Sequence, residues 1–144
     1  REMVALPEFQ ADPSWIAAKI FPTIKSDLAR ESLVLLQRLQ LVHYDESSGT
    51  WAQTQQTVPT GHRVRGVAIA RYHQQFLDIA RLAVTDAPPQ ERDFAAMTLC
   101  TDAAGFEMLR TMLHELQMRL MAEGEVQGGD RVAQINMQLF KVTK

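Results

Sequence analysis

The chain has 144 residues, of which 46% are hydrophobic and 22% are charged, with 15 Lys and Arg against 17 Asp and Glu. These values are typical of a globular protein with a core, and a net charge of −2 excludes a basic signature spread over the whole chain. No apolar run approaches the ~18 residues of a membrane span. The single cysteine, Cys100, excludes an internal disulfide and fits a reducing compartment. We expect a cytoplasmic protein with no membrane partner and, because the chain starts at Arg1, a fragment of a longer one.

Two helix signals come first along the chain. Asp12-Pro13 starts a short helix over residues 13–21, since Asp caps free amides and Pro suits the first turn. Ser26 or Asp27 caps a longer helix that runs to about Leu41. Its predicted apolar face follows helical spacing and consists of Leu28, Ser32, Leu35, Leu36, Leu39 and Val42.

A β-hairpin is predicted after the second helix. His43-Tyr44 and the run 51–54 flank a polar loop, DESSGT, that contains Gly49. Helix, turn, longer helix and hairpin is the order of a winged helix-turn-helix, so we assign residues 1–58 to a winged-helix-like domain. The following stretch, QQTVPTG, is a linker by composition.

Residues 59–144 predict an α-β-α-β domain with a small sheet, used for dimerisation or sensing. A helix of about 25 residues ends at Pro88-Pro89, and a second spans 102–125. FAAMTLCT (94–101) predicts a buried strand, and the alternation in AQINMQLF (133–140) predicts another. The fold class is therefore α+β. A sheet of two strands leaves open edges, which favours a homodimer; the alternative is that the helices cover the sheet within one chain.

No residue pattern indicates catalysis, a metal or a cofactor, so we expect a protein that is not an enzyme. The four histidines lie far apart and form no ligand motif. Cys100 lies within an apolar run and is expected to be buried. The cluster Glu91-Arg92-Asp93 is either catalytic or an ion-pair network that lies on the surface or ties a helix, and we favour the second.

The residues that could contact double-stranded DNA fall into two groups. Lys25, Ser26 and Arg30 lie at the start of the longer helix, where a reading helix presents side chains to base edges. Arg63 and Arg65 lie in a stretch without acids between residues 47 and 77, and they suit phosphates. The alternative is a solvated, basic helix start. The acidic turn residues oppose deep insertion of the hairpin into a groove.

Taken together, several stretches resemble one uncharacterised bacterial family of unknown function whose members are labelled as transcription regulators. The matching stretches are DPSWIAAKI (12–20), ESLVLLQRLQLV (31–42), QTVPTG (56–61), YHQQFLDIA (72–80), PPQERDFAAMTL (88–99) and DRVAQINMQLFKVTK (130–144). The resemblance implies a winged-helix-like segment, an α/β C-terminal region and a further helical region upstream. This chain departs from the family in having Lys141 where members commonly have Pro.

Two functions follow from these observations. The first is a dimeric transcriptional regulator that binds DNA through the winged helix. The second is a non-enzymatic module whose winged helix contacts a protein, with a partner or small-effector site in the second half. The acidic segment 86–130 and the methionines of the 102–125 helix motivate the second function.

Overall fold

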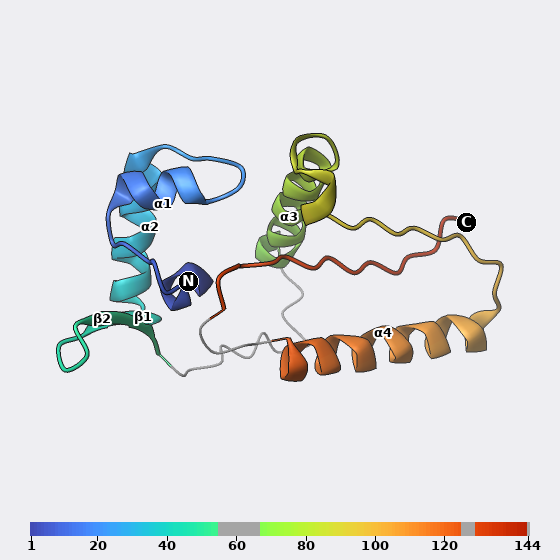
Figure 1. Cartoon of the computed structure of the whole chain (residues 1–144). Helices are drawn as coiled ribbons and strands as arrows, with labels where there is room; N and C mark the ends of the chain where they lie inside the picture. Colours follow the sequence, from blue (N-terminus) through green and yellow to red (C-terminus); the bar gives the residue numbers. More distant parts are fainter. Residues whose placement is uncertain (55–66, 125–128, 144) are drawn as a thin grey trace. The chain divides into compact units, whose positions relative to one another are not determined.

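The structure is a computed structural model that describes residues 1–54, 67–124 and 129–143 (Figure 1). It confirms an α+β chain with four α-helices and a two-stranded antiparallel sheet in these ranges. The chain divides into an N-terminal unit, residues 1–79 with 127–133, and a C-terminal unit, residues 80–126 with 134–144. The predicted boundary between residues 58 and 59, and the linker before Gly61, lie outside the described residues.

The N-terminal unit begins with a 3-10 helix, η1 (Glu2–Ala5), and the short helix α1 (Pro13–Lys19). Asp12 caps α1 as expected, because its carboxylate accepts hydrogen bonds from the amides of Ser14 (3.3 Å) and Trp15 (3.1 Å). The ammonium of Lys19 lies 5.5 Å from the centre of the Trp15 ring and 3.4 Å from Glu8. These contacts hold the segment before α1 against that helix.

Helix α2 (Ser26–Arg38) packs on α1 through a face that differs from the predicted one. Ala29 is buried, Leu33 and Leu36 are half-buried, and Ala17 is buried on α1. The expected apolar face was wrong in part, because Leu28, Leu35 and Leu39 are exposed. Alanine, with its single methyl group, lets two helix backbones approach closely. The small residues Ala17 and Ala29 therefore indicate where α1 and α2 meet, and the exposed leucines do not.

The hairpin consists of β1 (Val42–Asp45) and β2 (Thr50–Gln53), at the predicted place. The strands pair antiparallel in a register that sets Val42 opposite Gln53 and Tyr44 opposite Trp51. The Tyr44 and Trp51 rings meet edge to face at 5.9 Å between centroids. Phe9 lies 5.8 Å from Trp15 and 6.4 Å from Trp51 by the same measure. Aromatic pairs of this kind each contribute about 1 kcal/mol beyond their burial.

Helix α3 (Val67–Asp86) ends before Pro88, and η2 (Pro89–Glu91) follows. The guanidinium of Arg92 donates a hydrogen bond to the carbonyl of Ala83, 3.2 Å away. Carbonyls in the last turn of a helix have no partner within the helix, and Arg92 satisfies one of them. Arg92 therefore ties α3 to the segment that follows it through the backbone, and no ion pair of the predicted network forms among the described residues.

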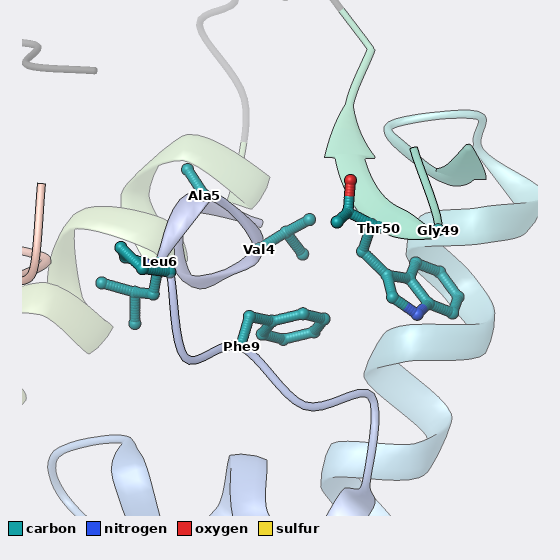
Figure 2. Close-up of a pocket in the computed structure, with 8 residues that line it drawn as sticks. Val4, Ala5, Leu6, Phe9, Gly49 and Thr50 are labelled. Carbon is teal, nitrogen blue, oxygen red and sulfur yellow. The ribbon is translucent and has the colours of Figure 1, made fainter. Parts of the chain in front are cut away.

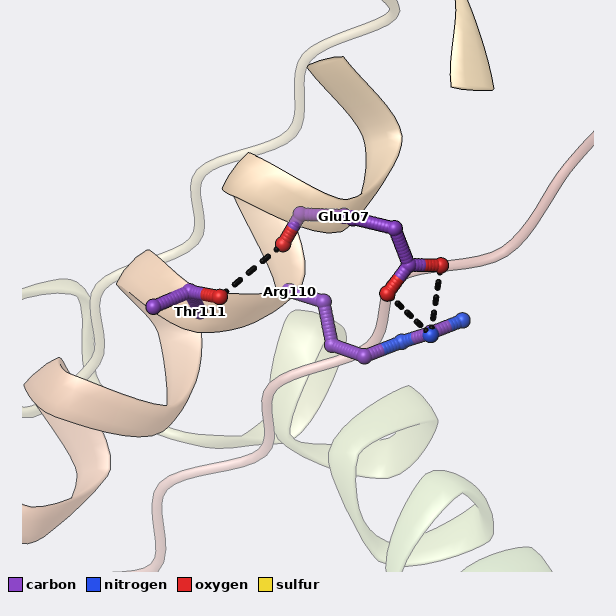
Figure 3. Close-up of polar contacts among 3 residues, drawn as sticks. All are labelled: Glu107, Arg110 and Thr111. Atoms are coloured by element: carbon purple, nitrogen blue, oxygen red, sulfur yellow. Dashed lines mark hydrogen bonds and ion pairs between the residues drawn. The ribbon is translucent and has the colours of Figure 1, made fainter. Parts of the chain in front are cut away.

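Helix α4 (Ala103–Glu123) begins at Asp102, whose carboxylate accepts a hydrogen bond from the Gly105 amide at 2.7 Å. Gly105 lies so close to the Thr101 hydroxyl that a side chain at this position would overlap it. On the helix surface, Arg110 pairs with Glu107 at 2.6 Å and the Thr111 hydroxyl donates to the Glu107 carbonyl at 3.1 Å (Figure 3). No residue of α4 is buried.

The two strands predicted for the second half are wrong in this structure. Residues 94–101 and 133–140 form neither helix nor strand, and Figure 1 shows both as elongated chains. Phe94 and Met97 are 52% and 79% exposed, so the first segment is not buried either, and Cys100 is exposed rather than enclosed. Alternation of polar and apolar residues requires a paired neighbour to become a strand, and the described residues supply none here.

Candidate nucleic-acid interface

The start of α2 places the predicted DNA-contacting residues in three different environments. Lys25 is the N-cap residue, with extended backbone (φ −75°, ψ 144°) and an exposed side chain. Ser26 is half-buried and lies three residues before the buried Ala29, on the packed face. Arg30 is exposed. Two of the three side chains are therefore available to a ligand, and Ser26 is the least accessible.

No acid among the described residues holds either basic side chain. Within the described ranges, neither Lys25 nor Arg30 takes part in an ion pair or a side-chain hydrogen bond. The first amides of a helix carry partial positive charge, which adds to the attraction for a phosphate. Asp27 and Glu31 are exposed on the same part of the helix and offset it. The local field is consequently mixed rather than strongly positive.

The first acid of the hairpin turn, Asp45, stabilises the turn through hydrogen bonds. The Asp45 carboxylate accepts hydrogen bonds from the Ser47 hydroxyl (2.6 Å), the Ser47 amide (2.9 Å) and the Ser48 hydroxyl (2.9 Å). These bonds, with the Ser47 hydroxyl first, lower the pKa of Asp45 to about 2. Gly49 completes the turn at φ +67°, a conformation that favours glycine. Asp45 therefore stays ionised, and together with the exposed Glu46 it keeps the hairpin tip negatively charged.

The other two predicted DNA contacts, Arg63 and Arg65, lie outside the described residues. On the part of α3 whose side chains are described, Arg71 and Arg81 are exposed. The structure thus brings Lys25 and Arg30 together at one helix end and does not test the phosphate contacts expected after the hairpin.

A pocket of about 310 Å³ lies between η1 and the hairpin, and the sequence reasoning missed it (Figure 2). In the figure, Val4, Leu6 and Phe9 approach from the N-terminal segment, and Gly49 and Thr50 from the hairpin. The full lining comprises Val4, Ala5, Leu6, Pro7, Phe9, Gly49, Thr50 and Trp51. The apolar residues before α1 were a signal for a packed N-terminal segment, but they do not reveal that its partner is the hairpin.

The described part of the chain has no group of three His, Cys, Asp or Glu side chains that could hold a metal ion. None of its helices is long and apolar enough to cross a membrane. The described histidines, including His43 and His114, are exposed. Chemistry at a metal centre formed by these residues is not indicated.

Comparisons with curated proteins and with solved structures give no match to this chain. One family model matches it, over residues 1–142, which is nearly the whole sequence. The match covers α1, α2, the hairpin and α4 together. The chain therefore belongs to the family described as domain of unknown function DUF4423.

Proposed function

We propose that the protein is a transcriptional regulator that binds double-stranded DNA, with α2 as the reading helix and the β-hairpin as the wing. The observation that carries the proposal is the first turn of α2, where Lys25 and Arg30 are exposed and unpaired among the described residues. Side chains at the N-terminal end of the second helix contact base edges in helix-turn-helix proteins. The bacterial regulator role implied by the family resemblance supports the same function.

The arrangement of the elements supports this proposal. Helices α1 and α2 pack on each other, and β1 contacts α2, so the hairpin is fixed beside the reading helix. Asp45 directs its carboxylate to Ser47 and Ser48 within the turn. Because Asp45 and Glu46 both carry negative charge, we expect the wing to lie outside the groove and not to enter it.

The charges set the expected strength of binding. If the charges of Lys25 and Arg30 each displace one counterion from the phosphates beside the bases that they read, affinity should fall roughly tenfold between 50 and 200 mM salt, from a slope of about −0.9 per charge. Asp27 and Glu31 reduce the attraction further, since they share this part of the surface. A single chain should bind weakly, and two chains should bind more strongly.

A homodimer would provide the second set of contacts. On α4, Met108, Met112, Leu116 and Leu120 recur every four residues and are 58%, 55%, 44% and 36% exposed. Residues at this spacing form the ridge by which two helices interlock. A second copy of α4 presents the same ridge and can accept it in an antiparallel arrangement. The proposal therefore assigns dimerisation to α4.

Fluorescence anisotropy with a labelled random duplex at 50 mM salt tests the proposal. Changing Lys25→Glu and Arg30→Glu together should weaken binding at least tenfold, because two attractive contacts become repulsive. The matched control is Arg81→Glu with Lys141→Glu, which makes the same change in charge at two exposed sites in the C-terminal unit. Equal affinities for the two double variants would reject α2 as the DNA-contacting helix.

One observation favours the second function, a protein-interaction module. Leu28, Leu35 and Leu39 form an apolar stripe on α2 and are 51%, 43% and 54% exposed. A solvated DNA-reading helix does not need such a stripe, whereas a partner helix could bury it. In a chemical cross-linking experiment, the chain with all three residues changed to Gln should then no longer capture a partner protein. The Lys25→Glu, Arg30→Glu variant should still capture it.

A further inference from the structure

We infer that the pocket between η1 and the hairpin binds an uncharged, planar aromatic molecule of about two fused rings. This site is separate from the proposed base-reading residues of α2, although its lining residues 49–51 belong to the hairpin that is the proposed wing. The inference rests on the composition, the size and the construction of the pocket.

The composition favours an uncharged aromatic ligand. None of the eight lining residues carries an ionisable side chain, and two of them, Phe9 and Trp51, are aromatic. An ion that entered the pocket would find no counter-charge on these side chains. A flat ring gains contact with both aromatic side chains, whose centroids lie 6.4 Å apart with planes at 74°. The Thr50 hydroxyl is the one polar side chain in the lining and can orient a ring N–H.

The size favours two rings over one. An apolar cavity of about 150 Å³ holds a benzene molecule. The pocket, at about 310 Å³, has twice that volume and lies at the lower end of the range for small-molecule sites. A bicyclic molecule such as indole therefore fills it better than a single ring.

The walls are held in place by contacts that do not involve a ligand. Val4 is buried, and the Gln53 amide donates a hydrogen bond to the Glu2 carboxylate at 2.8 Å, which ties β2 to η1. Phe9 is fixed on its other side by Trp15, 5.8 Å away between centroids. Because both walls are supported, a ligand would not have to order them, and little binding energy is lost to ordering.

The probe for the test is indole, titrated into the whole chain labelled with 5-fluorotryptophan and followed by fluorine NMR. The chain has two tryptophans, of which Trp51 lines the pocket and Trp15 does not. The Trp51 signal should shift in a saturable manner, with a Kd on the order of 1 mM for a ligand this small. The Trp15 signal should shift much less. Benzoate, which carries a charge, should bind at least tenfold more weakly.

Ala5→Phe places a ring in the pocket and should abolish the saturable shift, while Ala18→Phe, at an exposed position on α1, should leave it unchanged. Thr50→Phe fills the pocket from the hairpin side and replaces Ala5→Phe if that variant does not fold. A linear shift without saturation, equal shifts of both tryptophans, or binding that survives both filling variants would overturn the inference. None of these results depends on whether the protein binds DNA.

Discussion

The segment of residues 1–54 and helix α4 contain similar apolar residues but bury them very differently. Val4, Ala17, Ala29 and Val42 are the buried apolar residues of the described chain, and all of them lie in the first segment. Helix α4 buries none, although methionines and leucines occupy much of its surface. A short helix pair with a hairpin can bury its apolar side chains within itself, whereas a long helix with apolar residues around much of its surface needs another surface to cover them. We therefore expect the first segment to fold without the rest of the chain. We expect α4 to be stabilised by assembly with another surface.

The largest expected effect breaks the core of the first segment. Val42→Asp places an unpaired charge at a position that is 2% exposed and should cost about 4 kcal/mol in the free energy of unfolding. Val34→Asp, the same substitution at a 58% exposed position on α2, should cost less than about 1 kcal/mol. Urea unfolding followed by tryptophan fluorescence measures both, since Trp15 and Trp51 lie in this segment. Equal losses would mean that Val42 is not a core residue.

The next effect concerns assembly through α4. Met108→Lys, Met112→Lys and Leu116→Lys together should shift the mass measured by light scattering from twice 16.3 kDa to 16.3 kDa. Three charges on the ridge would have to be buried in the dimer, at a cost of several kcal/mol. Glu107→Lys, Thr111→Lys and His114→Lys change the other side of the helix and serve as the control. A monomeric wild-type chain would contradict dimerisation outright.

A smaller effect compares the two helix caps. Asp12→Ala and Asp102→Ala each remove hydrogen bonds to the first amides of a helix, worth about 1 kcal/mol. Because α1 is part of the core, the first change should lower the urea midpoint measured by tryptophan fluorescence. The second should leave that midpoint unchanged and speed amide hydrogen exchange in the first turn of α4. The same midpoint shift for both variants would show that α4 folds together with the first segment.

The smallest effect is a dependence on pH at the hairpin turn. Folding lowers the pKa of Asp45 to about 2 from its ordinary 3.8. The ionised carboxylate therefore stabilises the folded turn above pH 4, and this stabilisation is lost as the pH falls towards 2. Near-ultraviolet circular dichroism of the Tyr44–Trp51 pair should weaken over this range. Asp45→Asn cannot titrate, and its signal should not show this transition. A wild-type signal that is flat from pH 4 to pH 2 falsifies the assignment.

Local signals in the sequence predicted the starts of α1 and α4 and the hairpin. The predicted cap of the longer helix by Ser26 or Asp27 was wrong, because Lys25 is its N-cap residue and no side chain caps it. The Asp12-Pro13 cap, the Asp102 start of α4 and the polar turn around Gly49 act over a few residues, so a single sequence contains all the information they need. The prediction of an α+β chain followed from these signals and is confirmed.

Properties that depend on distant partners could not be predicted in the same way. The contact face of α2 depends on where α1 lies, and Ala29 was not distinguishable from the exposed leucines by spacing alone. Residues 94–101 and 133–140 have strand-like composition, but a strand forms only where another strand pairs with it. Among the candidate site residues, Lys25 and Arg30 are exposed as expected, Ser26 is half-buried, and the pocket next to η1 was missed.

The close approach of Gly105 to Thr101 has a consequence for substitutions at the start of α4. A side chain at Gly105 would overlap the Thr101 hydroxyl, so Gly105→Ala requires the Thr101 side chain to take another rotamer. Thr101 is exposed, which leaves room for that change. The first turn of α4 therefore accepts a larger residue only together with a rearrangement of the residue that precedes its cap.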